Sequence, residues 1–370
     1  MEVLLLAGGG HFAELRLSSP HGPTMNCLWT APWPTADPDD ADFGSLAETY
    51  GAAPAGPFLA GYTGHALCLD NFGPPSANDA AQGIPLHGEA AARKWELEPL
   101  PEGCVARVEL PAAKLKFQRT VSLRKDSSVV CIDEAVTNYG RAAREVHWVQ
   151  HLSLGPPFLS PVHSSIHASL DHAMTWPLGY EGREMLRDDA AFEWPHAPSV
   201  QGGTLDLRIP FQRLGSGFVA AARVDITREV GYISALNWHA GLALIYCFRR
   251  EDSPWVAVWE ENCARAAAPW NGAAQVRGME FGTTPMPLGR EAIQKMGSLF
   301  ETPGSRIVPP AATLHARYIA CVAAVPQDWR KISDVIPGQH VLTLVGPQST
   351  DRLQVPAEGL LDFFLKGRKA

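Results

Sequence analysis

Glycine and proline recur along the entire chain, at 33 and 31 positions of 370, a distribution that disfavours long uninterrupted helices. Proline removes a backbone donor and clashes inside a helix, and glycine weakens one. Many short strands joined by turns fit this distribution. Because 46% of the residues are hydrophobic, the chain can still bury a large core. These features predict an all-β protein.

The segments between the glycines and prolines have the periodicity of strands. Residues 114–123 alternate polar and apolar side chains, residues 127–138 have a β-branched centre, and residues 144–154 follow as the next strand. Later strands are expected at residues 203–211, 218–226, 231–238, 242–248 and 255–261. Short helices are expected at residues 41–50 and 288–299. No internal repeat is visible, so we predict one domain over residues 1–370, a large antiparallel β-sandwich with few short helices.

Charge and cysteine content restrict the partners and the compartment. A net charge of −8 disfavours nucleic acids and anionic membranes, since both require a basic surface. The seven cysteines are scattered and form no CxxC pair, which indicates a reducing compartment. The sequence shows no signal peptide and no apolar segment of membrane-spanning length. A cytoplasmic protein is therefore expected.

One carboxylate stands out because its neighbours are small and apolar. In the segment VRGMEFGTTPMP, Glu280 lies between Gly278 and Gly282. A carboxylate is costly to bury unless another group pairs with it or the protein uses it. Glu280 is therefore either a paired structural side chain or a catalytic base. We expect the two glycines to form a tight turn that presents it to a pocket.

Further polar residues interrupt the predicted strands. His147 and His151 are four residues apart, so they would share one face of a continuous strand. Glu260 and Glu261 follow Trp259 at the end of another strand. The chain has 11 tryptophans, and aromatic rings near carboxylates are typical of carbohydrate sites. The alternative is a solvated strand end beside tryptophans that fill the core.

Other kinds of chemistry lack their motifs. His163, His167 and His172 have no standard zinc spacing and no accompanying acidic or cysteine ligands. The chain contains no GxSxG elbow, no Walker A loop and no GxGxxG segment between a strand and a helix. We therefore expect neither a metal nor another cofactor.

Three segments occur in the order found in the aldose 1-epimerase (galactose mutarotase) family. IPLHGEA resembles the early histidine–glycine segment of that family and contains His87. Residues 120–155 resemble its central module of two strands, a VTN turn and a histidine, which places His151. GMEFGTTPMP resembles its late Gly-x-x-Glu segment and contains Glu280. The likeness covers roughly residues 1–325.

This resemblance implies a galactose mutarotase-like supersandwich and a reaction on sugars. It implies that Glu280 is the catalytic base, that His151 is the acid, and that His87 hydrogen-bonds a sugar hydroxyl or shares in charge stabilisation. A carboxylate and an imidazole suit mutarotation, because a proton leaves the anomeric hydroxyl while another reaches the ring oxygen. Weaker candidates for the wall of the pocket are Asn71, Trp259 and Glu260.

The sequence also departs from the family. Leu152 replaces the usual proline after the histidine, and Asp70-Asn71-Phe72-Gly73 stands where an arginine–asparagine motif is usual. The identity of the sugar therefore stays open. Two other functions also stay open: a non-catalytic carbohydrate-binding protein, and a glycosidase that uses Glu260 or Glu261 with Glu280. The expected partner is a small sugar, and the protein would be a monomer or a homodimer.

Overall fold

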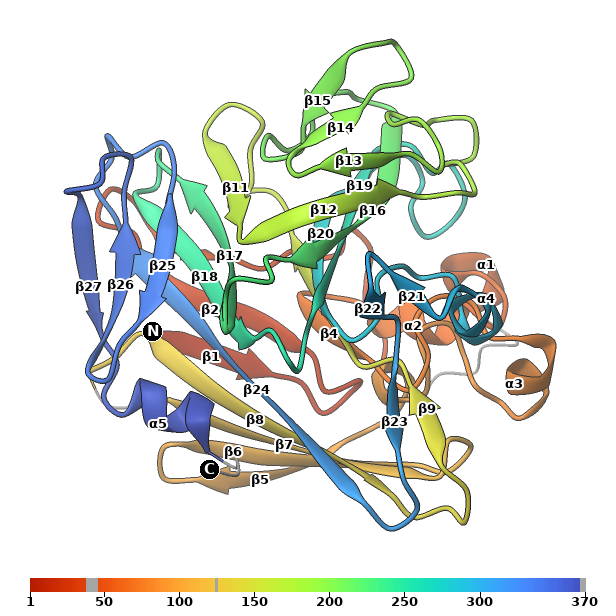
Figure 1. Cartoon of the computed structure of the whole chain (residues 1–370). Helices are drawn as coiled ribbons and strands as arrows, with labels where there is room; N and C mark the ends of the chain where they lie inside the picture. Colours follow the sequence, from red (N-terminus) through yellow and green to blue (C-terminus); the bar gives the residue numbers. More distant parts are fainter. Residues whose placement is uncertain (38–45, 124–125, 367–370) are drawn as a thin grey trace.

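The computed structural model describes residues 1–37, 46–123 and 126–366, which form two large antiparallel sheets packed face to face (Figure 1). The strands of the first sheet are β1 (Glu2–Leu5), β2 (Phe12–Ser18), β3 (Thr24–Asn26), β4 (His65–Cys68), β10 (Val149–Leu154), β12 (Leu170–Thr175), β13 (Ala191–Glu193), β16 (Ser216–Val224), β19 (Trp255–Asn262) and β20 (Gln275–Gly282). Their order is β1-β2-β4-β10-β20-β19-β16-β12-β13, with β3 beside β2. Strands β10, β20 and β19 therefore lie at the centre of this sheet.

The second sheet contains the longest strands. They are β5 (Glu96–Leu100), β6 (Gly103–Leu110), β7 (Leu115–Leu123), β8 (Val129–Asn138), β11 (Ser164–Ala168), β17 (Val230–Asn237), β18 (Leu242–Arg249) and β24 (Thr313–Ala324). Their order is β11-β17-β18-β24-β8-β7-β6-β5, and the neighbours pair antiparallel. This second sheet packs behind the central strands of the first sheet.

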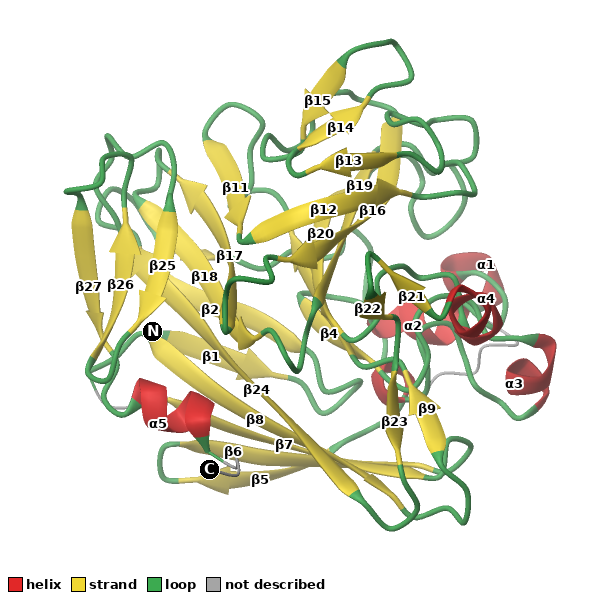
Figure 2. Cartoon of the chain, in the orientation of Figure 1, coloured by secondary structure: helices red, strands yellow, loops and turns green. Residues whose placement is uncertain are grey.

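Smaller elements surround the two sheets (Figure 2). The short strands are β9 (Arg144–Val146) with β23 (Arg306–Val308), β14 (His196–Pro198) with β15 (Thr204–Asp206), β21 (Ser298–Leu299) with β22 (Thr302–Pro303), and β25 (Asp334–Pro337) with β26 (Val341–Val345) and β27 (Arg352–Pro356). The helices are α1 (Ala47–Tyr50), α2 (Gly56–Gly61), α3 (Ala77–Ala81), α4 (Arg290–Met296) and α5 (Leu360–Leu365), with a 3₁₀ turn η1 (Ala90–Ala92). Helices α1 to α4 gather on one side of the molecule (Figure 1). Within the described ranges, no helix is long and apolar enough to cross a membrane.

The main core lies between the two sheets, and strand alternation decides which residues enter it. Leu152 and Leu154 of β10 and Met279 and Phe281 of β20 join this core. Successive side chains of a strand point to opposite faces. The residues between them, including His151 and Glu280, therefore lie on the other face of the sheet. A second apolar cluster, made of aromatic residues and α2, covers that face.

The predicted all-β sandwich is confirmed, and most predicted strands are present. Residues 114–123 and 127–138 contain β7 and β8, and residues 288–299 contain α4. Of residues 203–211 only β15 is a strand. The helix expected at residues 41–50 lies partly outside the described residues, and α1 occupies the end of that range. Residues 144–154 form two strands, β9 and β10, rather than one.

A buried polar network joins the sheets directly behind the middle of β10. Arg119 donates from Nε to Oε1 of Glu134 at 2.7 Å, and both side chains are fully buried. Gln150 donates to Oε2 of Glu134 at 2.6 Å, and Tyr318 donates to Oε1 at 2.9 Å. His65 contacts Oε1 of Gln150 through Nε2 at 3.0 Å. Because buried polar groups are costly when unpaired, this network fixes Gln150 in one place.

Candidate active site

His151 and Glu280 form a pair on neighbouring strands of the first sheet. The antiparallel register of β10 and β20 places the two residues opposite each other. Both side chains point away from the main core and are buried, with 4% and 2% of their surfaces exposed. Nε2 of His151 lies 3.3 Å from Oε1 of Glu280. The two residues proposed from sequence as acid and base are therefore in contact.

Burial changes the proton affinity of both groups in opposite directions. It raises the pKa of Glu280 well above its usual range, because an enclosed carboxylate loses its hydration. It lowers the pKa of His151 to about 3, because the imidazolium also loses hydration. The two shifts favour the neutral form of the pair, in which the shared proton is on Glu280 and the His151 imidazole is uncharged. Transfer of this proton across the contact gives a carboxylate and an imidazolium without any change in proton number.

Two hydroxyl groups hold the other side of the imidazole ring. Nδ1 of His151 lies 3.3 Å from the Tyr62 hydroxyl and 3.2 Å from the Ser153 hydroxyl. These two hydroxyls are 2.6 Å apart. Tyr62 follows α2, and Ser153 is two residues beyond His151 on the same face of β10. They orient the ring so that Nε2 points at Glu280.

The glycines beside Glu280 do not form the expected turn. Gly278 and Gly282 lie within strand β20. A Cβ atom on Gly278 would meet Oε1 of Glu280 at 2.3 Å and the Trp259 ring at 3.1 Å, and one on Gly282 would meet the backbone oxygen of Trp148 at 2.3 Å. The glycines therefore make room for the carboxylate and for the neighbouring strand. The predicted turn was wrong, because these glycines lie within a strand, where the Glu280 side chain and the backbone of Trp148 fill the space beside them.

His87 reaches the same site from the long loop after β4. Its ring centroid lies 5.4 Å from that of His151 and 4.7 Å from that of Phe58. The backbone N–H of Gly73 donates to Nδ1 of His87 at 3.2 Å. Burial lowers the pKa of His87 well below its usual range, so the ring is neutral and its proton is on Nε2. His87 is thus a hydrogen-bond donor at the site.

These residues line a cavity of about 490 Å³, a size that suits a small ligand. Its wall is largely aromatic, from Phe58, Tyr62, Trp176, Tyr180, Trp259 and Trp270. Its acidic, basic and histidine lining residues are His87, His151, Glu181, Arg265 and Glu280. Sequence reasoning missed Tyr62, Trp176, Tyr180 and Arg265 as site residues. A signal existed only for Arg265, which follows the tryptophan-rich strand by a few residues.

Glu260 does not line the cavity, which corrects its assignment to the pocket wall. It follows Trp259 on β19, so its side chain points to the opposite face of the sheet. There Glu260 forms a fully buried ion pair with Arg277. It also accepts a hydrogen bond from the Phe211 backbone N–H at 2.9 Å. Glu260 is thus a structural carboxylate.

Asn71 also has a different position from the one expected. It does not line the cavity, and its side-chain amide donates to the backbone oxygens of Gly73 at 2.8 Å and Pro74 at 3.2 Å. Gly73 and Pro74 themselves line the cavity. Asn71 therefore shapes the loop that forms part of the wall, and the amide donors proposed for a sugar are already occupied.

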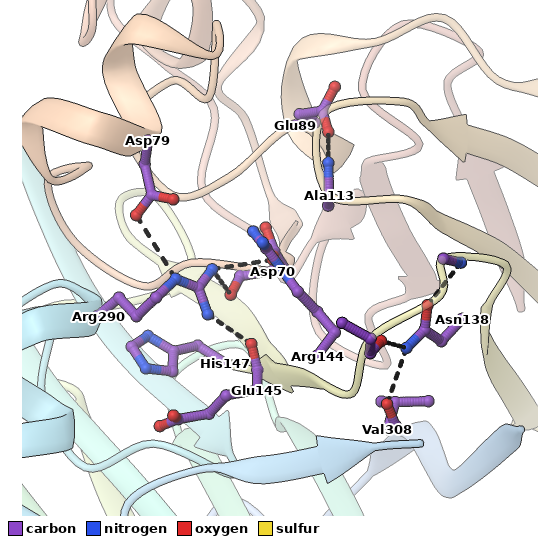
Figure 3. Close-up of polar contacts among 12 residues, drawn as sticks. Asp70, Asp79, Glu89, Ala113, Asn138, Arg144, Glu145, His147, Arg290 and Val308 are labelled. Atoms are coloured by element: carbon purple, nitrogen blue, oxygen red, sulfur yellow. Dashed lines mark hydrogen bonds and ion pairs between the residues drawn. The ribbon is translucent and has the colours of Figure 1, made fainter. Parts of the chain in front are cut away.

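His147 does not share a face with His151, because the chain leaves the sheet between β9 and β10. Nδ1 of His147 accepts from the Phe72 backbone N–H at 3.1 Å. Beside it, Asp70 is ion-paired with Arg144 and with Arg290, the latter at 2.9 Å (Figure 3). This group anchors the loop that presents Gly73 to His87.

The second carboxylate of the predicted Glu260–Glu261 pair lies close to the cavity but is fully engaged. Oε2 of Glu261 accepts from the Tyr180 hydroxyl at 2.8 Å. Oε1 accepts from the backbone N–H groups of Ala264 and Arg265. Neither oxygen is free for catalysis, so the contacts do not favour a glycosidase that uses Glu261 with Glu280. Across the described residues, no group of three or more His, Cys, Asp or Glu side chains could hold a metal ion.

Comparison with known proteins supports the fold. No protein-family model and no curated protein matches the chain. A candidate aldose 1-epimerase from Klebsiella pneumoniae superposes with a TM-score of 0.57 at 15% identity, over 88% of this chain and 77% of the other. One from Escherichia coli gives 0.55 at 14% identity, over 88% and 99%. A galactose mutarotase-like protein from Clostridium acetobutylicum gives 0.53 at 11% identity, over 87% and 92%. The fold is a galactose mutarotase-like sandwich.

Proposed function

We propose that the protein is an aldose 1-epimerase-type isomerase, which interconverts the anomers of a hexose or a related aldose. The observation that carries this proposal is the contact between His151 and Glu280 in the wall of a sugar-sized cavity. Mutarotation needs one group that accepts a proton and one that donates a proton, both beside the O1–C1–O5 unit. The His151–Glu280 pair has both capacities and needs no cofactor.

In the proposed mechanism, the carboxylate of Glu280 removes the proton from the anomeric hydroxyl. The His151 imidazolium gives its proton to the ring oxygen, and the ring opens. Rotation about the C1–C2 bond presents the other face of the aldehyde, and closure returns both protons. The burial that raises the pKa of Glu280 makes its carboxylate a stronger base, and the burial that lowers the pKa of His151 makes its imidazolium a stronger acid.

The other lining residues supply binding. The Nε2–H group of His87 can donate to a sugar hydroxyl, since Nδ1 already accepts from Gly73. The Trp259 ring centroid lies 5.9 Å from that of His151, so a pyranose packed on the indole would place its anomeric centre near the pair. The Trp259 indole N–H donates to the Tyr180 hydroxyl at 2.8 Å, which fixes the ring.

The test is anomer exchange by NMR with wild-type protein and a panel of aldoses, neutral and anionic. We expect faster exchange than in buffer alone for at least one of them. If sugars raise the unfolding temperature but exchange is never accelerated, the protein binds carbohydrate without catalysis, and the isomerase proposal is wrong.

The pH dependence gives a second expected result. An exposed Glu–His pair, with ordinary pKa values of about 4.3 and 6.5, would lose its one-proton form above about pH 6.5. Here the raised pKa of Glu280 keeps that proton bound as the pH rises. We therefore expect the enzyme-dependent rate to fall only at a pH higher than the value of about 6.5 that applies to an exposed pair.

The measurement is the exchange rate after subtraction of the rate in buffer at each pH. The pH range of the assay stays near neutrality because acid destabilises the fold. The pKa values of His87, His147 and His151 are lowered in the folded protein. Below about pH 6.5 these histidines therefore bind more protons in the unfolded chain than in the folded one. Stability therefore decreases with acidification. A steep loss of activity from pH 6 to pH 8 in folded protein would contradict the proposed state of the pair.

A further inference from the structure

One cation faces the cavity without a hydrogen bond from its side chain. Arg265 is the one Lys or Arg among the described residues that line the cavity. Its guanidinium carbon lies 5.0 Å from the ring centroid of Tyr180, 5.7 Å from that of Trp259 and 5.1 Å from that of Trp270. The side chain is 30% exposed. Three rings hold the guanidinium in place, and its N–H groups donate to no described residue.

Two carboxylates balance the charge of Arg265 only in part. Oε2 of Glu261 lies 3.7 Å from its Nε, and Oε1 of Glu181 lies 3.9 Å away. These are ion-pair distances longer than a hydrogen bond. Glu261 already accepts three other hydrogen bonds, and Glu181 is 74% exposed, so water screens its attraction. The N–H groups of the guanidinium thus remain available to a ligand.

We propose that the sugar carries a negative charge, on a carboxylate, phosphate or sulfonate group distant from C1, and that Arg265 binds this group. The proposal rests on the proposed function for the placement of C1. Trp259 neighbours both groups: its ring centroid lies 5.9 Å from that of His151 and 5.7 Å from the Arg265 guanidinium carbon. A sugar lying across this indole places C1 at the acid–base pair and its far end at the cation.

The geometry favours an anion over a neutral hydroxyl group. A guanidinium presents parallel N–H donors that match two oxygens of a carboxylate or phosphate, and such charged hydrogen bonds are about twice as strong as neutral ones. The partly enclosed aromatic wall reduces screening of that charge. With a net charge of −8, the protein as a whole repels anions, so selection of one requires a local cation such as Arg265.

The experiment measures binding rather than catalysis. Calorimetric titration of wild-type protein compares a neutral hexose with the corresponding hexuronate, hexose 6-phosphate and 6-sulfohexose. We expect at least one anionic sugar to bind about tenfold tighter than the neutral hexose or better. Arg265→Met should reduce this ratio to near one, and Arg265→Lys should retain part of it. Lys116→Met, a matched loss of charge on the other sheet, should leave the ratio unchanged.

Three outcomes would overturn the inference. Wild-type protein could bind the neutral hexose as tightly as every anionic sugar, or bind no anionic sugar at all. Arg265→Met could weaken neutral and anionic sugars by the same factor, which would make Arg265 a packing or hydroxyl-binding residue. The two proposals fail separately. Selective binding of an anion without accelerated anomer exchange contradicts the isomerase proposal alone. Accelerated exchange together with equal binding of neutral and anionic sugars contradicts the anion site alone.

Discussion

The Glu280→Gln variant is expected to lose enzyme-dependent anomer exchange by a factor of about 10²–10⁴, the usual contribution of general acid–base catalysis. Glutamine keeps the shape of the side chain but neither accepts nor releases a proton at neutral pH. The variant should fold normally, because burial keeps Glu280 protonated and an amide replaces a neutral carboxyl group. The measurement is saturation-transfer NMR on the aldose that the wild-type protein turns over fastest.

The unfolding temperature of Glu280→Gln, measured beside its activity, separates a chemical from a structural effect. If the variant catalyses anomer exchange as fast as wild-type protein, Glu280 takes no part in the mechanism. A variant that loses both activity and fold would show that the carboxyl group is structural. The matched control is Glu260→Gln, the same substitution on the neighbouring strand β19 but on the opposite face of the sheet.

For Glu260→Gln we expect a loss of about 3–5 kcal/mol in the free energy of unfolding, the usual cost of removing one partner of a buried ion pair. Arg277 is fully buried, and besides Glu260 it donates to the backbone oxygens of Leu207 and Ile209. The substitution leaves its charge without a compensating carboxylate. The measurement is urea unfolding followed by circular dichroism.

The exchange rate per folded molecule of Glu260→Gln should match that of wild-type protein, because Glu260 does not face the cavity. An unchanged urea midpoint together with lost activity would show that Glu260 acts in the active site and would contradict its structural role. The two substitutions on adjacent strands should therefore have opposite results, one on rate and one on stability.

The sequence was sufficient to predict the fold class and to single out His151 and Glu280, whose acid and base roles stay a prediction. Period-two alternation predicted β7, and a β-branched apolar centre predicted β8, each within two residues of the observed ends. The positions of His151 and Glu280 followed from the order of three short segments. The contact between them depends on the strand order β10-β20, which local patterns do not contain, because strands far apart in sequence become neighbours only through the topology.

The errors have a common physical origin. Glu260 was expected in the wall with Trp259, although alternation along a strand puts adjacent residues on opposite faces. His147 was expected to share a face with His151, but the strand is interrupted between them. Tyr62 and Arg265 come from loops that have no periodicity, so only tertiary packing brings them to the cavity.

The network behind β10 has a consequence for how this sequence can change over evolutionary time. Gln150 faces the sheets' shared interior and His151 faces the cavity, so insertion or deletion of one residue within β10 would move each following side chain to the opposite face of the sheet. A deletion before Gln150 would place the His151 imidazole against Glu134 and Arg119, and an insertion there would place the Gln150 amide against Glu280. Substitutions in β10 can be tolerated one at a time, whereas changes in its length cannot. We expect length variation among descendants of this chain to be confined to the loops, and the count of residues across β10 to be fixed.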